Sequence, residues 1–219
     1  MAWKRVGSRL PQLLVGLVLY GLSGALLVRG RLGLDPWDVL HQGIAGHAGL
    51  AIGTVVIIVG AAVLLFWIPL RQRPGIGTIC NAVLIGLAMN AALDVLPRVS
   101  ALPWRVADMA GGVLLCGVAT GMYIGANLGP GPRDGLMTGL ARRTGRSIRL
   151  TRTALEVSVL VTGWALGGTV GIGTVAFAVS IGPLVQVFLP LFDRDARDGR
   201  VVSASAQIRA AAVEQSACG

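Results

Sequence analysis

The stretch Leu-Gly-Leu-Asp-Pro-Trp-Asp-Val-Leu at 32–40 returns as Leu-Gly-Pro-Gly-Pro-Arg-Asp-Gly-Leu at 128–136. Each copy has the pattern of a helix start: an N-cap residue, a proline at the first helical position and an aspartate at the third. These residues are Asp35, Pro36 and Asp38, then Gly131, Pro132 and Asp134. Proline loses no hydrogen bond there, and the aspartate can bond back to the cap and faces the positive end of the helix dipole. The sequence therefore predicts two helices that begin at these motifs.

The motif belongs to a longer internal repeat. A shift of 96 residues lays 12–96 on 108–192 without a gap, and 24 of the 85 positions are identical. The identities include Gly-Ile-Gly-Thr at 75–78 and 171–174, where Thr78 and Thr174 are expected to cap a helix. Each unit holds three apolar stretches, an odd number, so the second copy is predicted to insert upside down relative to the first.

The composition indicates lipid as the solvent. The chain is 54% hydrophobic and 13% charged, whereas soluble domains are usually about 25% charged. Six apolar stretches of roughly 17–22 residues are long enough to span a membrane. They cover 10–28, 50–70, 78–96, 107–128, 150–170 and 174–192. The predicted fold is an all-α membrane protein: six transmembrane helices as two inverted three-helix repeats, each with a short extra helix after its first span.

The distribution of Lys and Arg predicts the orientation. With the N-terminus inside, the cytoplasmic segments hold 15 of these residues and the external segments hold 4, a strong positive-inside signal. Both termini are expected in the cytoplasm of a bacterial cell, with the helices in its inner membrane. The net charge of +9 then indicates contact with anionic lipid headgroups rather than with nucleic acid. The predicted segments are a cytoplasmic N-terminus (1–9), the first repeat (10–96), an external linker (97–107), the second repeat (108–192) and a disordered cytoplasmic tail (193–219).

The short helices allow two placements. Each is about 12 residues long, or roughly 18 Å, which is too short to span. In a re-entrant placement the two opposed N-termini form a polar site at mid-depth that favours an anion or a polar group, with Arg133 as the charge partner. In an interfacial placement both helices lie flat, Trp37 anchors at the outer headgroups, and Arg142 and Arg143 lie at the inner ones.

Polar residues within the spans add candidates for a solute site. Glu156 is the only acid well inside a predicted span, and Arg152 precedes it by four residues. This spacing fits an ion pair on one helix face, while the alternative is a proton- or cation-linked carboxylate that lines a cavity. Asn81 is either an interhelical hydrogen-bond donor or a solute contact. The candidate solute-binding residues are Asp35, Pro36, Asp38, Asn81, Gly131, Pro132, Arg133, Asp134, Arg152 and Glu156.

The sequence contains no pattern typical of an enzyme. It has no nucleophile–base pair or phosphate-binding loop, and its three cysteines and two histidines lack metal-ligand spacing. No enzyme activity, cofactor or metal is therefore expected.

The second copy of the motif carries a family resemblance. Gly-Pro-Gly-Pro-Arg-Asp-Gly-Leu-Met at 129–137, followed by Arg152, Glu156 and Gly-Ile-Gly-Thr at 171–174, resembles the YczE/YyaS/YitT family of bacterial membrane proteins, and most closely its YczE branch. The first copy also fits, and the resemblance covers about 10–192. It implies a bacterial inner-membrane protein and no catalytic residue.

Two functions follow as expectations. Inverted repeats are typical of transporters and channels, so the first is a small polar or anionic solute bound between the repeats. The second is a membrane scaffold or regulatory protein without transport, which recruits a cytoplasmic partner through its arginine-rich segment and tail. A water-sized cavity near Asp38, Asp134 and Glu156 would favour transport, and a solid apolar midplane would favour the scaffold. Units of this size often dimerise, so a homodimer is a further expected partner.

Overall fold

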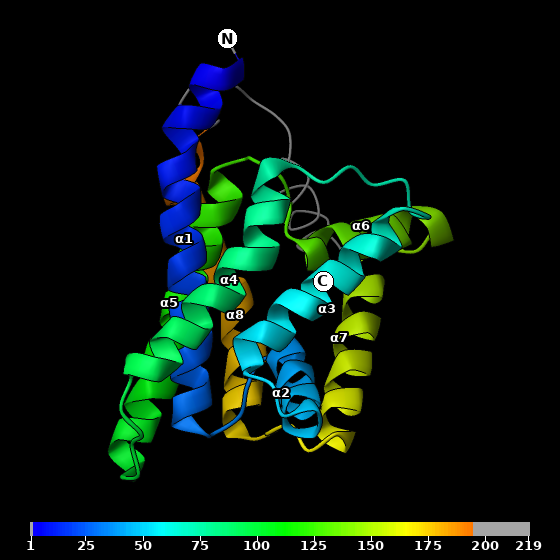
Figure 1. Ribbon diagram of the computed structural model, residues 1–219. Coiled ribbons are helices and arrows are strands. Elements are labelled where there is room, and N and C mark those ends of the chain that lie inside the picture. The colour runs from blue at the N-terminus through cyan, green and yellow to red at the C-terminus, as the bar shows by residue number, and fades with distance from the viewer. Residues whose placement is uncertain (1, 195–219) are drawn as a thin grey trace.

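The computed structural model describes residues 2–194, and this part of the chain forms eight helices (Figure 1). They are α1 (Ala2–Gly30), α2 (Pro36–Ala48), α3 (Ile52–Trp67), α4 (Ile76–Val95), α5 (Leu102–Gly125), α6 (Pro132–Thr144), α7 (Ile148–Ala165) and α8 (Ile172–Phe192). The starts of α2, α3 and α4 recur in α6, α7 and α8 at the 96-residue offset of the sequence repeat. The predicted tail over 193–219 lies almost entirely outside the described residues.

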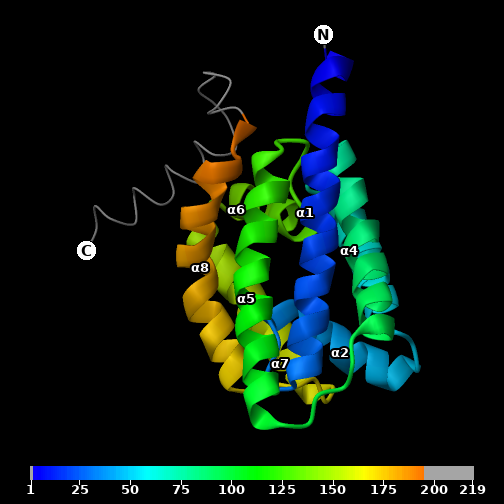
Figure 2. The ribbon, with the colours of Figure 1, turned by 90° about the vertical axis from the view of Figure 1, so that its left-hand side faces the viewer.

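The helices form two layers. In the first layer α1 packs between α4 and α5, and α5 packs on α8 at its other side; Figure 2 shows these four helices side by side, with α2, α6 and α7 behind them. In the second layer α2 packs on α7 and α3, and α6 packs on α3 and α7. The start of α1 and the end of α8 lie at the same end of the molecule (Figure 2).

Within the described part of the chain, four helices are long and apolar enough to cross a membrane, and they are the four of the first layer. The α2 and α3 helices meet at 112° and could together count as a fifth, broken span. The stretches expected to span at 50–70 and 150–170 form shorter helices. The α3 helix has 16 residues, about 24 Å against a hydrocarbon core of about 30 Å, and the 18 residues of α7 include Arg149, Arg152 and Glu156. The all-α membrane fold is confirmed, while six spans in an inverted arrangement stay a prediction.

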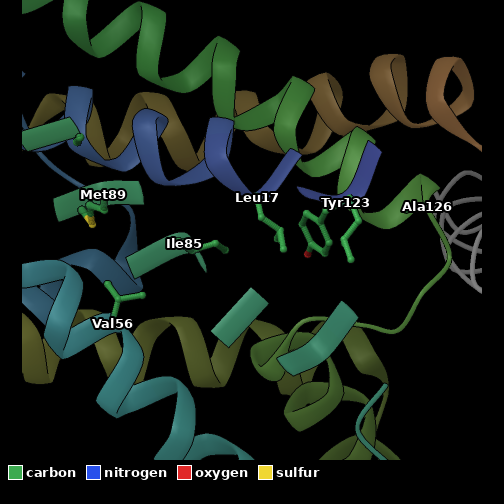
Figure 3. Packing of buried hydrophobic residues seen from close by; sticks show 8 residues of the cluster. Leu17, Val56, Ile85, Met89, Tyr123 and Ala126 are labelled. Atoms are coloured by element: carbon green, nitrogen blue, oxygen red, sulfur yellow. The ribbon is translucent and has the colours of Figure 1, made fainter. Parts of the chain in front are cut away.

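A hydrophobic cluster joins the two layers. Leu17 of α1, Ile85 and Met89 of α4 and Tyr123 of α5 pack with Val56 of α3 (Figure 3). Small residues let the helices around this cluster approach closely, as expected where lipid supplies no hydrophobic drive for association.

The two loops before α2 and α6 dock reciprocally on the opposite repeat. The backbone N–H of Gly173 in α8 donates to the carbonyl of Leu32 (2.8 Å), and that of Gly77 in α4 donates to the carbonyl of Leu128 (2.9 Å). Gly33 and Gly129, the next residues of the loops, have φ of +124° and +125°. Only glycine adopts this conformation without strain and lets backbones come so close.

The predicted threonine caps differ in detail from the observed ones. The N-cap residues are Gly75 and Gly171, and the threonines stand at the third helical position. Their Oγ1 atoms accept from the backbone N–H of these glycines, at 3.2 Å for Thr78 and 3.3 Å for Thr174. The threonines therefore cap from inside the first turn, as the third residue of a capping box does.

The crossing of α3 and α4 is the tightest contact between the layers. A Cβ atom on Gly53 would collide with the carbonyl oxygen of Gly86, and a Cβ atom on Gly86 would collide with that of Gly53. The side chain of Asn90 accepts from the backbone N–H of Gly53 (2.9 Å) and donates to Thr54 Oγ1 (3.2 Å). Shape and hydrogen bonding thus hold α3 on α4.

This crossing predicts different outcomes for two equivalent glycines. Gly86→Ala should lower the unfolding temperature, because overpacking a tight contact costs about 1–3 kcal/mol. Its counterpart Gly182 in α8 has no atom within 4 Å of an added Cβ, so Gly182→Ala should be neutral or stabilise by up to about 1 kcal/mol through helix propensity. Thermal unfolding of both purified variants in detergent checks this, and equal losses would contradict the tight crossing.

Candidate functional site

The first turns of α2 and α6 are both buried inside the protein. Asp35 is the N-cap of α2, and its Oδ1 accepts from the backbone N–H groups of Trp37 (2.8 Å) and Asp38 (2.9 Å). This satisfies two of the N–H groups that a helix start leaves without partners. Gly131, the N-cap of α6, adopts the same backbone conformation, with φ −62° and ψ 159° against −64° and 158° for Asp35. The predicted helix starts are therefore confirmed.

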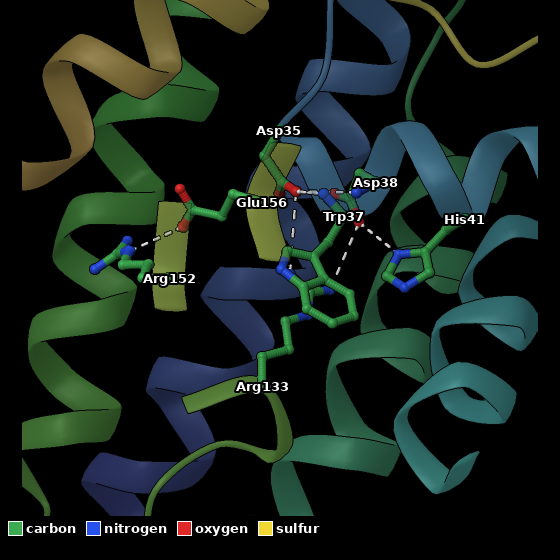
Figure 4. A network of polar contacts seen from close by, with 7 residues as sticks. All are labelled: Asp35, Trp37, Asp38, His41, Arg133, Arg152 and Glu156. Atoms are coloured by element: carbon green, nitrogen blue, oxygen red, sulfur yellow. Dashed lines mark hydrogen bonds and ion pairs between the residues drawn. The ribbon is translucent and has the colours of Figure 1, made fainter. Parts of the chain in front are cut away.

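Arg133 joins the two helix starts. Its guanidinium lies 4.0 Å from Asp35 Oδ1 and 3.9 Å from Asp38 Oδ1 (Figure 4). The same group stands 5.0 Å from the centre of the Trp37 ring, within the range of a cation–π interaction. Opposite charges from two segments almost a hundred residues apart thus face one another in the interior.

Asp38 and Asp134, equivalent in the repeat, have different partners. Asp38 Oδ1 lies 2.9 Å from His41 Nδ1, one helical turn further along α2. Asp134 Oδ2 instead accepts from the Tyr123 hydroxyl at 2.7 Å. The expectation that Asp38 bonds back to its cap is wrong, because its carboxylate turns to Arg133 and His41 while its backbone N–H donates to Asp35. We call Asp35, Asp38, His41, Arg133 and Asp134 the charge cluster.

A cavity of about 70 Å³ adjoins the charge cluster. A water molecule needs at least about 10–15 Å³ of such space, so the cavity can hold more than one. Its polar lining comes from both repeats: Tyr20, His41, Asn81, Tyr123, Arg133 and Asp134. Trp37 also lines it, and the buried Nε1 of that ring has no hydrogen-bond partner within residues 2–194. The cavity thus combines charged groups with the hydroxyl and amide groups of its lining.

Most of the candidate residues from the sequence meet at this place. Asp35, Asp38, Arg133 and Asp134 belong to the charge cluster, and Asn81 lines the cavity. Three further candidates, Pro36, Gly131 and Pro132, belong to the two helix starts. Gly131 is buried close to Asp134 and Asn81, Pro132 accepts at its carbonyl from Trp67 Nε1 (3.0 Å), and Pro36 opens α2.

Arg152 and Glu156 stand apart from the charge cluster. They form an ion pair of 2.8 Å on α7, and their side chains are 57% and 33% exposed (Figure 4). The i,i+4 ion pair expected from the spacing is confirmed.

The interfacial placement of the short helices fails at Trp37. This residue is 6% exposed and packs with Val63 and Trp67, so the expectation that it anchors at the outer headgroups is wrong. Its large apolar ring is buried because α2 begins inside the protein and not at its surface. Arg142 and Arg143 are exposed near the end of α6, where the interfacial placement also puts charges.

Sequence reasoning missed four residues of the site, including Tyr20 of the cavity lining. His41 was considered only as a metal ligand, yet its position three residues after Asp38 on a helix was a signal that the two side chains could meet. Trp37 and Tyr123 carried no such signal, because their partners come from other helices.

Comparisons with known proteins agree with the resemblance found in the sequence. The model of a family of unknown function, DUF6198, matches residues 7–190. An uncharacterized protein of Haemophilus influenzae is 41% identical over 192 residues, 88% of each chain. The uncharacterized membrane protein YczE of Bacillus subtilis is 34% identical over 177 residues, 80% of this chain and 82% of its own. YyaS of the same organism is 25% identical over 184 residues, 82% of this chain and 92% of its own. No solved structure matches. The chain is an integral membrane protein of the DUF6198 family, similar to YczE and YyaS over most of its length.

Proposed function

We propose that the protein is a transporter or channel for a small polar solute, neutral or cationic, which binds at the charge cluster. The observation that carries this proposal is the contact of Arg133 with Asp35 and Asp38 beside the cavity of about 70 Å³. A scaffold that only recruits a partner would be expected to have a solid apolar interior at this point.

Six spans in two inverted repeats form part of the proposal. The loop before α2 contacts α8, the loop before α6 contacts α4, α2 packs on α7, and α3 packs on α6. An exchange of partners of this kind is what a two-fold axis between α1 and α5 would produce. In transporters with inverted repeats such an axis lies in the membrane plane and the solute binds near it. The shorter α3 and α7 would then complete the spans with α2 and α6 as re-entrant helices.

The signs of the buried charges favour a neutral or cationic solute over an anion. Arg133 was expected to pair with an anionic solute, but it already faces two carboxylates, and Asp134 adds a third. An anion would therefore meet more acidic than basic groups. Charges within a membrane are costly and usually mark the path of a solute or ion.

The first test concerns Asp134. Asp134→Asn removes the charge but keeps an oxygen for the Tyr123 hydroxyl, so the protein should fold while solute binding and flux are lost. A ligand present at a hundred times its dissociation constant stabilises the folded protein by about 2.7 kcal/mol. A thermal-shift screen with ammonium, guanidinium, urea, nitrate and bicarbonate can therefore find compounds that bind. Uptake of any binder into proteoliposomes measures flux.

Asp94→Asn is the matched control, because Asp94 is exposed near the end of α4 and remote from the cavity lining. It should bind and transport like the unchanged protein. Full flux in Asp134→Asn would refute the site, and a screen in which no compound binds any variant would favour the scaffold.

A second test separates the structural from the functional part of the charge cluster. Arg133→Gln should destabilise by about 3–5 kcal/mol, because it leaves two buried carboxylates without a counter-charge. Adding Asp38→Asn should recover part of this loss. A double-mutant cycle of unfolding free energies measures the coupling, and strictly additive effects would show that the two charges do not interact. Solute binding should stay lost in the double variant even where stability returns.

A further inference from the structure

The two repeats differ most where their third and fourth helices meet. In the first repeat Ala82, Gly86 and Asn90 form the side of α4 that contacts α3. At the 96-residue offset, α8 carries Ala178, Gly182 and Gln186, and all three are exposed. An added Cβ on Gly182 would meet nothing within 4 Å, although Gly86 is in contact with α3. Within residues 2–194, nothing therefore covers the side of α8 that is equivalent to a closed helix contact.

The sequence of α7 explains why this contact does not form. Gly53, which lets α3 approach Gly86, is replaced at the equivalent position by Arg149, and Gly60 is replaced by Glu156. A long charged side chain cannot occupy the space in which two glycine backbones touch. Accordingly α7 packs mainly on α2 of the other repeat, and α8 packs on α5.

The inner face of α7 is packed in the second half of the helix and carries exposed charged side chains in the first half. Val159, Leu160 and Gly163 pack against the protein, Gly163 directly on Leu40. Glu156 lies one turn earlier on the same face, and Arg152 one turn before that, yet their side chains are 33% and 57% exposed. On this side of α7 the packing thus ends at the ion pair, while Thr151 on the adjoining side stays buried.

We infer that the space between the first half of α7 and α8 is an aqueous crevice that leads from one membrane surface toward Asp134. Glu156 lies eight residues into α7, about 12 Å along the helix axis, where an exposed ion pair needs water. The α7 helix also packs on α6, whose first turn carries Asp134. The arginines at the start of α7 place the entrance on the cytoplasmic side by the positive-inside rule.

The crevice narrows the class of solute, a step that rests on the proposed function. Its wall carries Arg149 and the ion pair of Arg152 with Glu156, and the net positive charge of these three groups disfavours cations. The charge cluster carries more acids than bases, which disfavours anions. A solute that passes through the crevice and then binds at the charge cluster is therefore expected to be a neutral polar molecule.

Cysteine accessibility tests the crevice. In a background in which Cys80, Cys116 and Cys218 are replaced by alanine, Gly182→Cys and Ala178→Cys are placed on the uncovered side of α8. The control is Leu87→Cys, at a residue that is 52% exposed in the middle of α4 beside the closed contact. The probe is the anionic 2-sulfonatoethyl methanethiosulfonate, added to inside-out membrane vesicles, with labelling of the denatured protein to normalise the amounts.

Cysteines at 182 and 178 should react at least about tenfold faster than the cysteine at 87, because only a hydrated thiol ionises to the reactive thiolate. Equally slow reaction at all three positions would overturn the crevice and would leave the solute site itself standing. Fast labelling at 182 and 178 in a protein that shows no flux would support the crevice and refute the proposed solute transport. Reaction at 182 and 178 only from the other side of the membrane would overturn the cytoplasmic entrance.

Discussion

The first turn of an α-helix leaves four backbone N–H groups without intrahelical partners, and α2 and α6 bury this turn inside a membrane protein. Asp35 satisfies two of these groups in α2. A carboxylate in such a place needs a counter-charge, because a buried charge without one is strongly destabilising. Arg133 supplies it from the start of α6. The buried carboxylate at the start of α2 thus requires the start of α6 to lie opposite to it. The cavity and its polar lining lie where these two helix starts meet.

The loops that lead into these helices hold the arrangement in place. Gly33 and Gly129 adopt a backbone conformation that other residues rarely adopt, and the residue before each one accepts a hydrogen bond from the helix start of the other repeat. The two repeats are therefore connected by exchanged backbone contacts, in addition to the packing of α1 on α5. Such contacts depend on the close approach that glycine permits, which gives a physical reason for the glycine-rich motif in both copies.

The repeats share a backbone plan but differ in chemistry. Asp38 contacts His41 and Arg133, while its counterpart Asp134 contacts a tyrosine. The contact of α3 with α4 depends on Gly53, whereas Arg149 stands at the equivalent place in α7. With an equal backbone and unequal side chains, the contact of α3 with α4 is closed, while the equivalent residues of α8 are exposed. In a protein that moves solutes, this asymmetry would distinguish the two membrane surfaces.

The sequence by itself determined the helical membrane class, the 96-residue repeat and the starts of α2 and α6, because apolar length, repeated identities and cap residues are local signals. It also gave the ion pair of Arg152 with Glu156, whose spacing lies within one helix. Only the tertiary structure decided that Arg133 faces two carboxylates, that Tyr123 reaches Asp134 and that Trp37 is buried. These contacts join helices far apart in the chain, and no local pattern specifies which helices will touch. The same reason applies to the missing contact of α7 with α8 within residues 2–194. Arg149 prevents close packing there, but its effect depends on which two helices cross, and a local pattern does not specify that.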